Sequence, residues 1–371
     1  MQINTLLQTA VERKASDLHL SVGLAPIIRL YGELLPLDAP KLGPPDTADL
    51  AKQIMNEKQR AVFEEKGELD MAYSCPGLAR FRVNVYRQRG SIAIAMRVVN
   101  TEIPSTEELR LPEVVKKFSR FRRGLLLVTG PTGSGKSTTQ ASIIDLINQE
   151  RNCHIITLED PIEYLHRNKN SMINQREIGQ DSKDFATGLR SALRQDPDVI
   201  LVGELRDLET ISIAITAAET GHLVIATLHT MDTVQTIDRV IDVFPPHYKQ
   251  QVRIQMSNIL VGVLAQRLLR LREGQGQIPA VEILLANPAV CNIIREGKIH
   301  QLYSAIQTGG RQGMQLMDSH LEELCRRGLV DRQTALESAT DPEELAKVLQ
   351  REPVGPARSL FGPEGSRERY R

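Results

Sequence analysis

The chain has 371 residues, 41% of them hydrophobic, which is enough to build the cores of two or three domains. Its 46 basic and 46 acidic residues give a formal net charge of +0, and this balance argues against a dedicated nucleic-acid-binding protein. The four cysteines show no paired spacing, so we expect neither a zinc site nor a disulfide framework, and a reducing cytosol fits. Because the chain shows no signal peptide and no apolar run near the roughly 20 residues that span a bilayer, we expect a soluble protein that reaches a membrane only through a partner.

Residues 1–100 predict a strand-rich α+β domain. Two of its segments have apolar residues at helical spacing and four resemble strands: helices at 3–14 and 47–66, and strands at 16–23, 25–37, 79–86 and 91–98. The last two strands predict a hairpin that turns within 87–90. Residues 101–119 contain two prolines and many charges, and we expect a linker with one short helix there.

The next segment, residues 120–272, predicts an α/β core. Short apolar runs alternate with helical stretches, at 125–130, 154–160, 198–204 and 222–230. Strands buried on both faces and separated by helices indicate a mostly parallel sheet. We expect residues 248–272 to form one long amphipathic helix that closes the core, and residues 273–350 to form a region of short helices. The tail, 351–371, is rich in Pro, Gly, Arg and Glu and predicts disorder.

A phosphate-binding loop is the most specific motif in the chain. The pattern G-x-x-x-x-G-K-[ST], with the threonine that follows it, is matched by Gly130, Pro131, Thr132, Gly133, Ser134, Gly135, Lys136, Ser137 and Thr138. An apolar strand precedes the motif and a helical run follows it, as a P-loop requires. The glycines let backbone N–H groups surround ATP phosphates, Lys136 neutralises their charge, and the Ser137 hydroxyl ligates Mg²⁺. The alternative is a glycine-rich turn with a chance Lys-Ser pair.

Hydrolysis also needs carboxylates that hold the metal and orient water. The usual metal-side Asp at the end of a later strand is replaced here by Gly203, so Glu204 becomes the candidate, acting directly or through a water. Another strand ends in the acidic turn of Glu159, Asp160 and Glu163, of which Glu163 is the candidate to orient or deprotonate the attacking water. For both segments the alternative is a solvated acidic loop.

Two histidines, His222 and His229, flank the apolar strand 223–228. A histidine at a strand end can sense a γ-phosphate or face a neighbouring subunit, although lone histidines are more often structural.

These segments together resemble the type II/IV secretion ATPase superfamily. The resemblance rests on a Walker A motif, an Asp box, an atypical Walker B motif and a His box: GPTGSGKST (130–138), ITLEDPIEY (156–164), ILVGELRD (200–207) and TGHLVIATLHT (220–230). Further matches are SDLHL (16–20), GLAPIIRLYGEL (23–34), RFRVN (80–84) and GMQLMDSHLEELCRRGLV (313–330). The resemblance covers residues 1 to about 348 and supports catalytic roles for Glu163 and His229.

Within the superfamily the chain is most similar to the pilus retraction ATPases. Only about 120 residues precede the core, and no tetracysteine motif follows AQRLLR (265–270), unlike the extension and secretion ATPases. Residues 289–296 read AVCNIIRE where retraction ATPases carry a motif close to AIRNLIRE, so Cys291 stands in place of an arginine. This departure leaves a divergent or accessory retraction paralogue as the alternative.

The resemblance implies a PAS-like N-terminal domain, a RecA-like core and a homo-hexameric ring. It places ATP between the two domains, with Arg82 and Arg97 of the predicted hairpin acting as arginine fingers rather than as a solvated basic face. With a turn at Gln88 and Arg89, Arg97 would pair with Arg80 and lie diagonally from Arg82.

The partners implied are a polytopic inner-membrane platform protein and a paralogous retraction ATPase, with no nucleic acid, at the cytoplasmic face of the inner membrane. A RecA-like nucleic-acid motor, a pilus extension or secretion ATPase and a non-hydrolysing scaffold are the alternatives.

Overall fold

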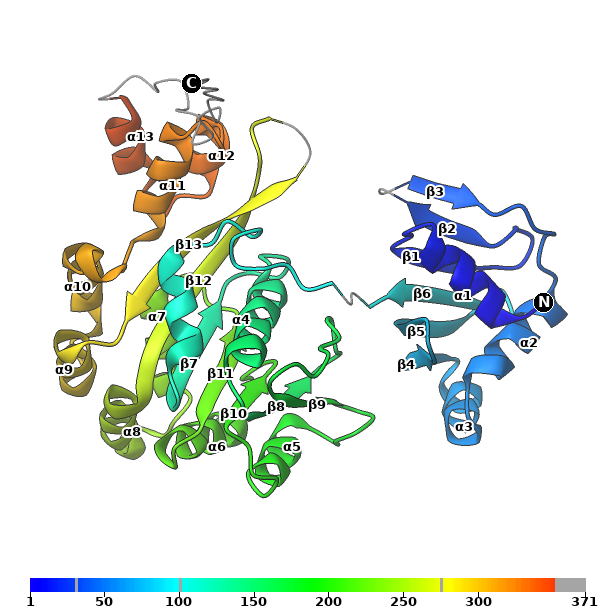
Figure 1. The fold of residues 1–371 in the computed structure, drawn as a ribbon, viewed down its shortest axis with the longest axis horizontal. Coiled ribbons are helices and arrows are strands. Elements are labelled where there is room, and N and C mark those ends of the chain that lie inside the picture. The colour runs from blue at the N-terminus through cyan, green and yellow to red at the C-terminus, as the bar shows by residue number, and fades with distance from the viewer. Residues whose placement is uncertain (31–32, 100–101, 274–275, 351–371) are drawn as a thin grey trace, which may run out of the picture. The chain divides into compact units, whose positions relative to one another are not determined.

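The computed structural model describes residues 1–30, 33–99, 102–273 and 276–350, in two compact units (Figure 1). Unit 1 comprises residues 1–103 together with 159–167 and 175–183, and unit 2 comprises the rest of the chain. The predicted disordered tail lies outside the described residues. None of the described helices is long and apolar enough to span a membrane.

Unit 1 is built on a six-stranded antiparallel sheet in the order β3-β2-β1-β6-β5-β4. Its elements are α1 (Ile3–Glu12), β1 (Asp17–Leu20), β2 (Ile27–Leu30), β3 (Glu33–Pro36), α2 (Pro44–Ile54), α3 (Glu57–Lys66), β4 (Glu68–Cys75), β5 (Ala79–Gln88) and β6 (Ser91–Val98). Alternate β5 residues, Phe81, Val83 and Val85, are fully buried and pack with Leu7 of α1 and Leu50 of α2 in one core. The α+β class predicted for this region is confirmed.

Two local predictions in unit 1 are corrected by backbone geometry. The single helix expected at 47–66 is two helices, because Asn56 begins α3 by accepting a hydrogen bond from the Gln59 N–H. The β5–β6 hairpin turns at Arg89 and Gly90, both with positive φ (51° and 79°), one residue later than expected. Arg82 therefore lies directly opposite Arg97, and the expected pairing of Arg80 with Arg97 is wrong.

Unit 2 contains a seven-stranded sheet in the order β13-β12-β7-β11-β10-β8-β9. Its strands are β7 (Gly124–Thr129), β8 (His154–Glu159), β9 (Met172–Glu177), β10 (Val199–Val202), β11 (Leu223–Leu228), β12 (Leu260–Arg270) and β13 (Gln277–Leu285). Its helices up to β12 are the 3₁₀ helix η1 (Glu113–Arg120), α4 (Lys136–Glu150), α5 (Phe185–Ala192), α6 (Leu208–Glu219), α7 (Thr233–Asp242) and α8 (Pro246–Ile259).

The centre of this sheet is parallel, as predicted, and β12 extends it. Every residue of β7, β10 and β11 is buried, because helices cover both faces of the sheet. This is the RecA-like α/β arrangement that the sequence predicts.

The long helix predicted at 248–272 is wrong in its second half. Helix α8 ends at Ile259, and Leu260–Arg270 form β12, parallel to β7 and antiparallel to β13. An apolar run buried on both sides has no strand periodicity, so sequence pattern alone cannot separate it from a buried helix. The sheet also continues to Leu285, beyond the boundary expected at residue 272.

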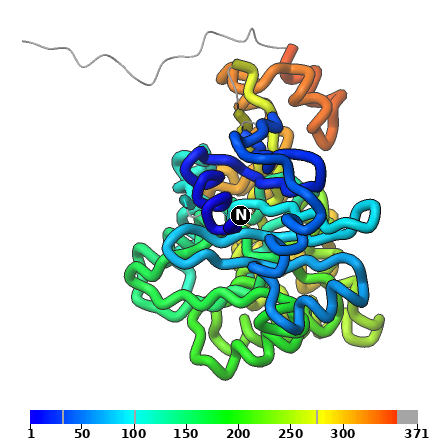
Figure 2. The backbone as a smooth tube through the Cα atoms, turned by 90° about the vertical axis from the view of Figure 1, so that its right-hand side faces the viewer, coloured from blue at the N-terminus to red at the C-terminus, as the bar shows by residue number. Residues whose placement is uncertain are grey.

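The C-terminal part of unit 2 is helical, as predicted. It comprises α9 (Pro288–Glu296), η2 (Ile299–Gln301), α10 (Leu302–Thr308), η3 (Gly310–Gln312), α11 (Met317–Arg326), α12 (Arg332–Glu337) and α13 (Pro342–Gln350). Helices α11 to α13 share a hydrophobic core with Leu269 of β12 and Ile278 of β13. Figures 1 and 2 both show these orange-to-red helices beside the yellow β12–β13 hairpin.

Candidate functional site

The predicted P-loop joins β7 to α4, as its motif requires. Gly130, Gly133 and Gly135 have φ values of 142°, 80° and 84°, which L-residues with a side chain rarely adopt. Lys136 begins α4 and is 8% exposed, and its Nζ donates hydrogen bonds to the carbonyl oxygens of Gly130 (2.8 Å) and Pro131 (2.9 Å). The ammonium group is therefore held against the loop, beside a helix N-terminus that favours anions.

The other predicted segments of unit 2 reach the same edge of the sheet. Leu228 of β11 pairs with Thr129 of β7, and β10 and β8 run parallel to β11. Because parallel strands have their carboxyl ends at one edge, the P-loop, His229 and Glu204 all follow from that edge. Ligand sites in open parallel sheets lie at such an edge.

Glu204 lies between a histidine and an arginine. Its Oε1 is 3.2 Å from Nε2 of His229, and its Oε2 is 2.7 Å from a guanidinium nitrogen of Arg206. Burial raises the pKa of Glu204, but the hydrogen bond and charge of Arg206, together with His229, outweigh burial and hold the pKa below its usual range. Glu204 is thus an ionised carboxylate at neutral pH, which suits a cation or a metal-bound water.

A threonine cluster that the sequence analysis missed connects the P-loop strand to the His box. Thr129 Oγ1 donates to the carbonyl oxygen of Thr230 (2.6 Å), and the Thr230 hydroxyl lies 2.7 Å from the hydroxyls of Thr129 and of Thr236. Thr129 precedes the P-loop, Thr230 ends the His box and Thr236 lies on α7, but threonine is too common at strand ends for its spacing to have been a signal. The cluster fixes the end of β11 next to the start of the P-loop.

The two predicted histidines lie at opposite ends of β11. His229 follows the carboxyl end and contacts Glu204. His222 precedes the strand, where its Nδ1 lies 2.9 Å from the carbonyl oxygen of Ala217 and 3.2 Å from Oγ1 of Thr220. Only His229 is therefore at the P-loop edge, and the structure gives His222 local contacts to the end of α6.

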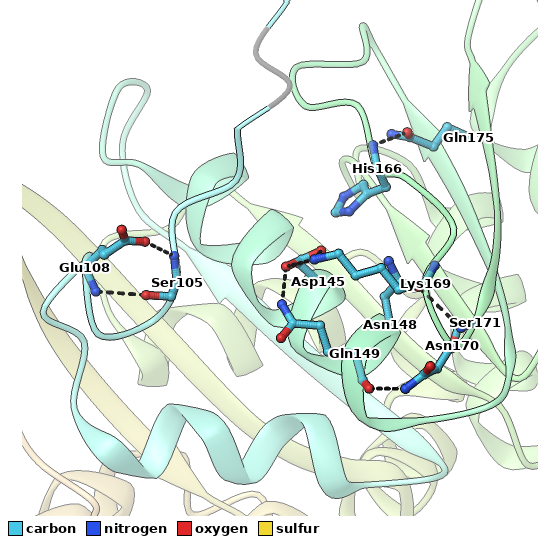
Figure 3. Close-up of polar contacts among 10 residues, drawn as sticks. All are labelled: Ser105, Glu108, Asp145, Asn148, Gln149, His166, Lys169, Asn170, Ser171 and Gln175. Carbon is cyan, nitrogen blue, oxygen red and sulfur yellow. Dashed lines mark hydrogen bonds and ion pairs between the residues drawn. The ribbon is translucent and has the colours of Figure 1, made fainter.

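The segment that follows the Asp box, residues 168–174, is attached to the far end of the P-loop helix α4 (Figure 3). Lys169 Nζ lies 2.7 Å and 2.8 Å from the two carboxylate oxygens of Asp145 on α4. Asn148 Oδ1 accepts a hydrogen bond from the Lys169 backbone N–H (3.1 Å), and Asn170 donates to the Gln149 carbonyl oxygen. The segment after the Asp box is thus attached to the helix that begins with the P-loop lysine.

The acidic turn itself belongs to unit 1 by its contacts. Glu159 accepts a hydrogen bond from Gln175 Nε2 (3.1 Å), and Asp160 is exposed. Glu163 is exposed and has no hydrogen-bond or ion-pair partner among the described residues. Its carboxylate is available to a ligand or to water.

The predicted arginine fingers also lie in unit 1, and they differ in their contacts. Arg97 Nε donates to Asp17 Oδ1 (2.8 Å), and Asp17 is 6% exposed. Arg80 contacts Glu177 at 3.0 Å. Arg82 is exposed and has no carboxylate partner in the part of the chain that the structure describes. Of these three arginines, Arg82 is therefore the one that no carboxylate of the described residues neutralises.

Comparison with known proteins identifies the family. The family model described as type II/IV secretion system protein matches residues 1–305. The type IV pilus retraction ATPase PilT of Pseudomonas aeruginosa is 49% identical over 345 residues, 93% of this chain and 100% of that protein. A twitching motility protein of Neisseria gonorrhoeae is 44% identical over 344 residues, 93% of this chain and 92% of that protein. The crystal structure of the pilus retraction motor PilT with bound ADP has a TM-score of 0.87 at 48% identity, covering 94% of this chain and 99% of that one. The chain belongs to the type II/IV secretion system protein family.

Proposed function

We propose that this protein is an ATP-hydrolysing motor that powers the retraction of type IV pili. The observation that carries the proposal is the edge of the unit 2 sheet, where a folded P-loop, an ionised Glu204 and His229 follow from adjacent parallel strands. The similarity to pilus retraction ATPases over nearly the whole chain supports the choice of process. Retraction is thus the work to which hydrolysis is coupled.

The nucleotide is ATP with Mg²⁺. The P-loop N–H groups and Lys136 bind the phosphates, and the Ser137 hydroxyl and Glu204 are the groups that hold the metal, Glu204 directly or through a water. Among the described residues no group of three or more His, Cys, Asp or Glu side chains gathers as a metal cage. Two oxygen-bearing side chains, Ser137 and Glu204, suit Mg²⁺, which at nucleotide sites is bound mainly by phosphate oxygens, waters and one or two side chains. When bound, Mg²⁺ neutralises the charge that develops on the phosphates.

Glu163 orients or deprotonates the attacking water, and His229 responds to the γ-phosphate through its contact with Glu204. Arg82 and Arg97, which both lie in the N-terminal domain, stabilise the phosphoryl group during its transfer. We infer a ring of six copies in the cytoplasm, beneath a polytopic inner-membrane platform protein, with a paralogous retraction ATPase as a further partner. This arrangement would turn domain motions driven by hydrolysis into work on the pilus.

The proposed direction of the motor is tested in a deletion strain. Loss of a retraction motor is expected to leave cells with excess pili that cannot twitch, because assembly continues without disassembly. The wild-type gene should restore twitching, and the Lys136→Ala gene should not, because the phosphate charge loses its fixed cation. Electron microscopy and stab-agar motility measure the result. Bald cells would instead indicate an extension motor, and purified protein whose turnover depends on single-stranded DNA would indicate a nucleic-acid motor.

Cys291 provides a separate prediction about force transmission. It lies half-buried on α9, where burial raises the pKa of its thiol, and α9 packs against α8, α10 and η2. We expect Cys291→Arg to change twitching speed while basal ATP turnover stays within about twofold, because α9 carries none of the residues assigned to nucleotide binding or catalysis. The neighbouring Asn292→Arg, which puts the same charge on another side of the helix, is the matched control. A large change in basal turnover would contradict a role in force transmission.

A further inference from the structure

Gln266 of β12 lies against the P-loop, although 129 positions separate it from Ser137 in the sequence. The side chain is 2% exposed, and both ends of its amide are bonded. Nε2 donates to the carbonyl oxygen of Ser134 at 2.7 Å, and Oε1 accepts from the Thr139 hydroxyl at 2.8 Å. Because a carbonyl oxygen can only accept, the contact with Ser134 fixes which end of the amide faces the loop.

The same residue explains why two positions of the motif are glycine. A Cβ atom on Gly130 would lie 2.2 Å from the backbone oxygen of Gln266, and one on Gly135 would lie 2.8 Å from its Nε2. Real Cβ atoms essentially never approach other atoms within 3.0 Å, so Gln266 of β12 occupies the space that a side chain at either position would need. The first and last glycines of the P-loop therefore pack directly on Gln266, in addition to having positive φ.

The hydrogen bond to Ser134 determines the orientation of a peptide group within the loop. A trans peptide is planar, so its carbonyl oxygen and the following N–H point to opposite sides. With the Ser134 carbonyl directed to Gln266, the N–H of Gly135 is directed away from β12. If Gln266 could no longer donate, the buried carbonyl oxygen of Ser134 would lack a hydrogen-bond partner. The peptide group would then be favoured to rotate until this oxygen finds another donor.

We propose that Gln266 is a positioning residue of the nucleotide site, which holds the P-loop in its phosphate-binding conformation through the carbonyl of Ser134. Thr139 acts with it by fixing the amide from the side of α4. The inference rests on the proposed ATPase function and adds to it a residue on a strand that no nucleotide-binding motif includes. It acts through the loop backbone and touches no reacting atom.

The test replaces the amide by an isosteric group whose ability to donate depends on pH. In full-length Gln266→Glu the ionised carboxylate cannot donate to Ser134, whereas the protonated acid can. Binding of fluorescent mant-ADP is measured at pH 8 and pH 6 against the wild type at the same pH. We expect affinity to fall about tenfold or more at pH 8, as for a buried acceptor left unpaired, and to recover substantially at pH 6, because burial raises the pKa of a glutamate.

Gln266→Met separates the lost donor from the added charge. Methionine fills similar space without donating, so its affinity should fall at both pH values and should not recover. Gln333→Glu is the matched control, since Gln333 is exposed on α12, where its side-chain amide donates to Glu337. It should bind mant-ADP like the wild type at both pH values. Thermal unfolding of each variant establishes that it is folded.

A second pair keeps the proposal testable if the Gln266 variants do not fold. Thr139→Ser retains the hydroxyl and should bind like the wild type, whereas Thr139→Val should weaken binding, because Gln266 loses the group that fixes its amide. Wild-type affinity in Gln266→Glu and Gln266→Met would overturn the proposal, and so would equal losses in both at every pH, which would indicate packing alone. Absence of ATP turnover in the wild type would refute the proposed function instead, and the mant-ADP measurements would still decide the role of Gln266.

Discussion

Glu163→Gln is expected to reduce ATP turnover by about 10²–10⁴-fold while nucleotide binding is retained, the range typical of a lost general base. Glutamine keeps the size of the side chain but cannot take a proton from water. Glu163 is well suited to this comparison because it is exposed and has no partner among the described residues, so the substitution breaks no contact of the fold. Steady-state phosphate release and mant-ADP titration measure the two quantities.

The alternative to a specific role is that the acidic turn contributes only its total charge. Asp160→Asn removes the same charge from the same turn and is expected to lose much less activity than Glu163→Gln. Equal losses in the two variants would show that Glu163 has no individual role.

Glu204→Gln is expected to differ from both, because its defect should shrink as the Mg²⁺ concentration rises, whereas the Glu163→Gln defect should not.

Arg82→Ala is expected to lower turnover by roughly 10³–10⁵-fold, the range reported for arginine fingers, without destabilising the isolated subunit. Arg82 is exposed and lies opposite Arg97 on the β5–β6 hairpin. Like charges that face each other across strands repel, and because Arg97 is already paired with Asp17, the charge left without a carboxylate among the described residues of this pair is that of Arg82. Turnover, thermal unfolding and mant-ADP binding of the purified subunit are the measurements.

Arg97 needs a different substitution. Removing it would leave the largely buried Asp17 with Arg29 at 3.8 Å, so Arg97→Ala combines a folding defect with any catalytic one. Arg97→Lys keeps a positive charge near Asp17 but not the planar guanidinium, and it should retain stability while losing turnover. A turnover unchanged in both Arg82→Ala and Arg97→Lys would exclude the hairpin from catalysis.

Mixing variants decides whether the arginine acts across a subunit boundary. A Lys136→Ala subunit supplies an intact Arg82, and an Arg82→Ala subunit supplies an intact P-loop. If the protein assembles as proposed, mixtures of the two variants should therefore regain part of the activity that each variant lacks alone. If no activity returns, action of the arginine within its own subunit stays open.

The contiguous motifs could be identified in the sequence because their physics is local. The P-loop needs glycines at the turn, a lysine at the helix start and an apolar strand before it, and all of these lie within about fifteen consecutive residues. The parallel sheet was predictable as well, since runs such as Val199–Val202 are apolar at every position only when both faces are covered. Glu204 and His229 were identified as strand-end residues, although not as a contacting pair.

Features that depend on which segments meet could not be predicted in the same way. β12 has the same apolar composition as a buried helix, and only its place between β7 and β13 makes it a strand. The error in the hairpin had a smaller cause: placing the two-residue turn one position early shifted the pairing by two residues, which kept both arginines on one face but changed their partners.

The sequence by itself therefore determined the nucleotide-binding loop, the mostly parallel core, the helical C-terminal region and the identity of the strand-end carboxylates. The tertiary structure decided that Glu204 contacts His229, that Arg82 faces Arg97, and that Gln266 lies against Gly130 and Gly135. The physical reason is that the first set follows from backbone conformation and burial over a few neighbouring residues. The second set consists of contacts between groups on different strands, or on the loops that follow those strands, and only the folded sheet brings these groups together.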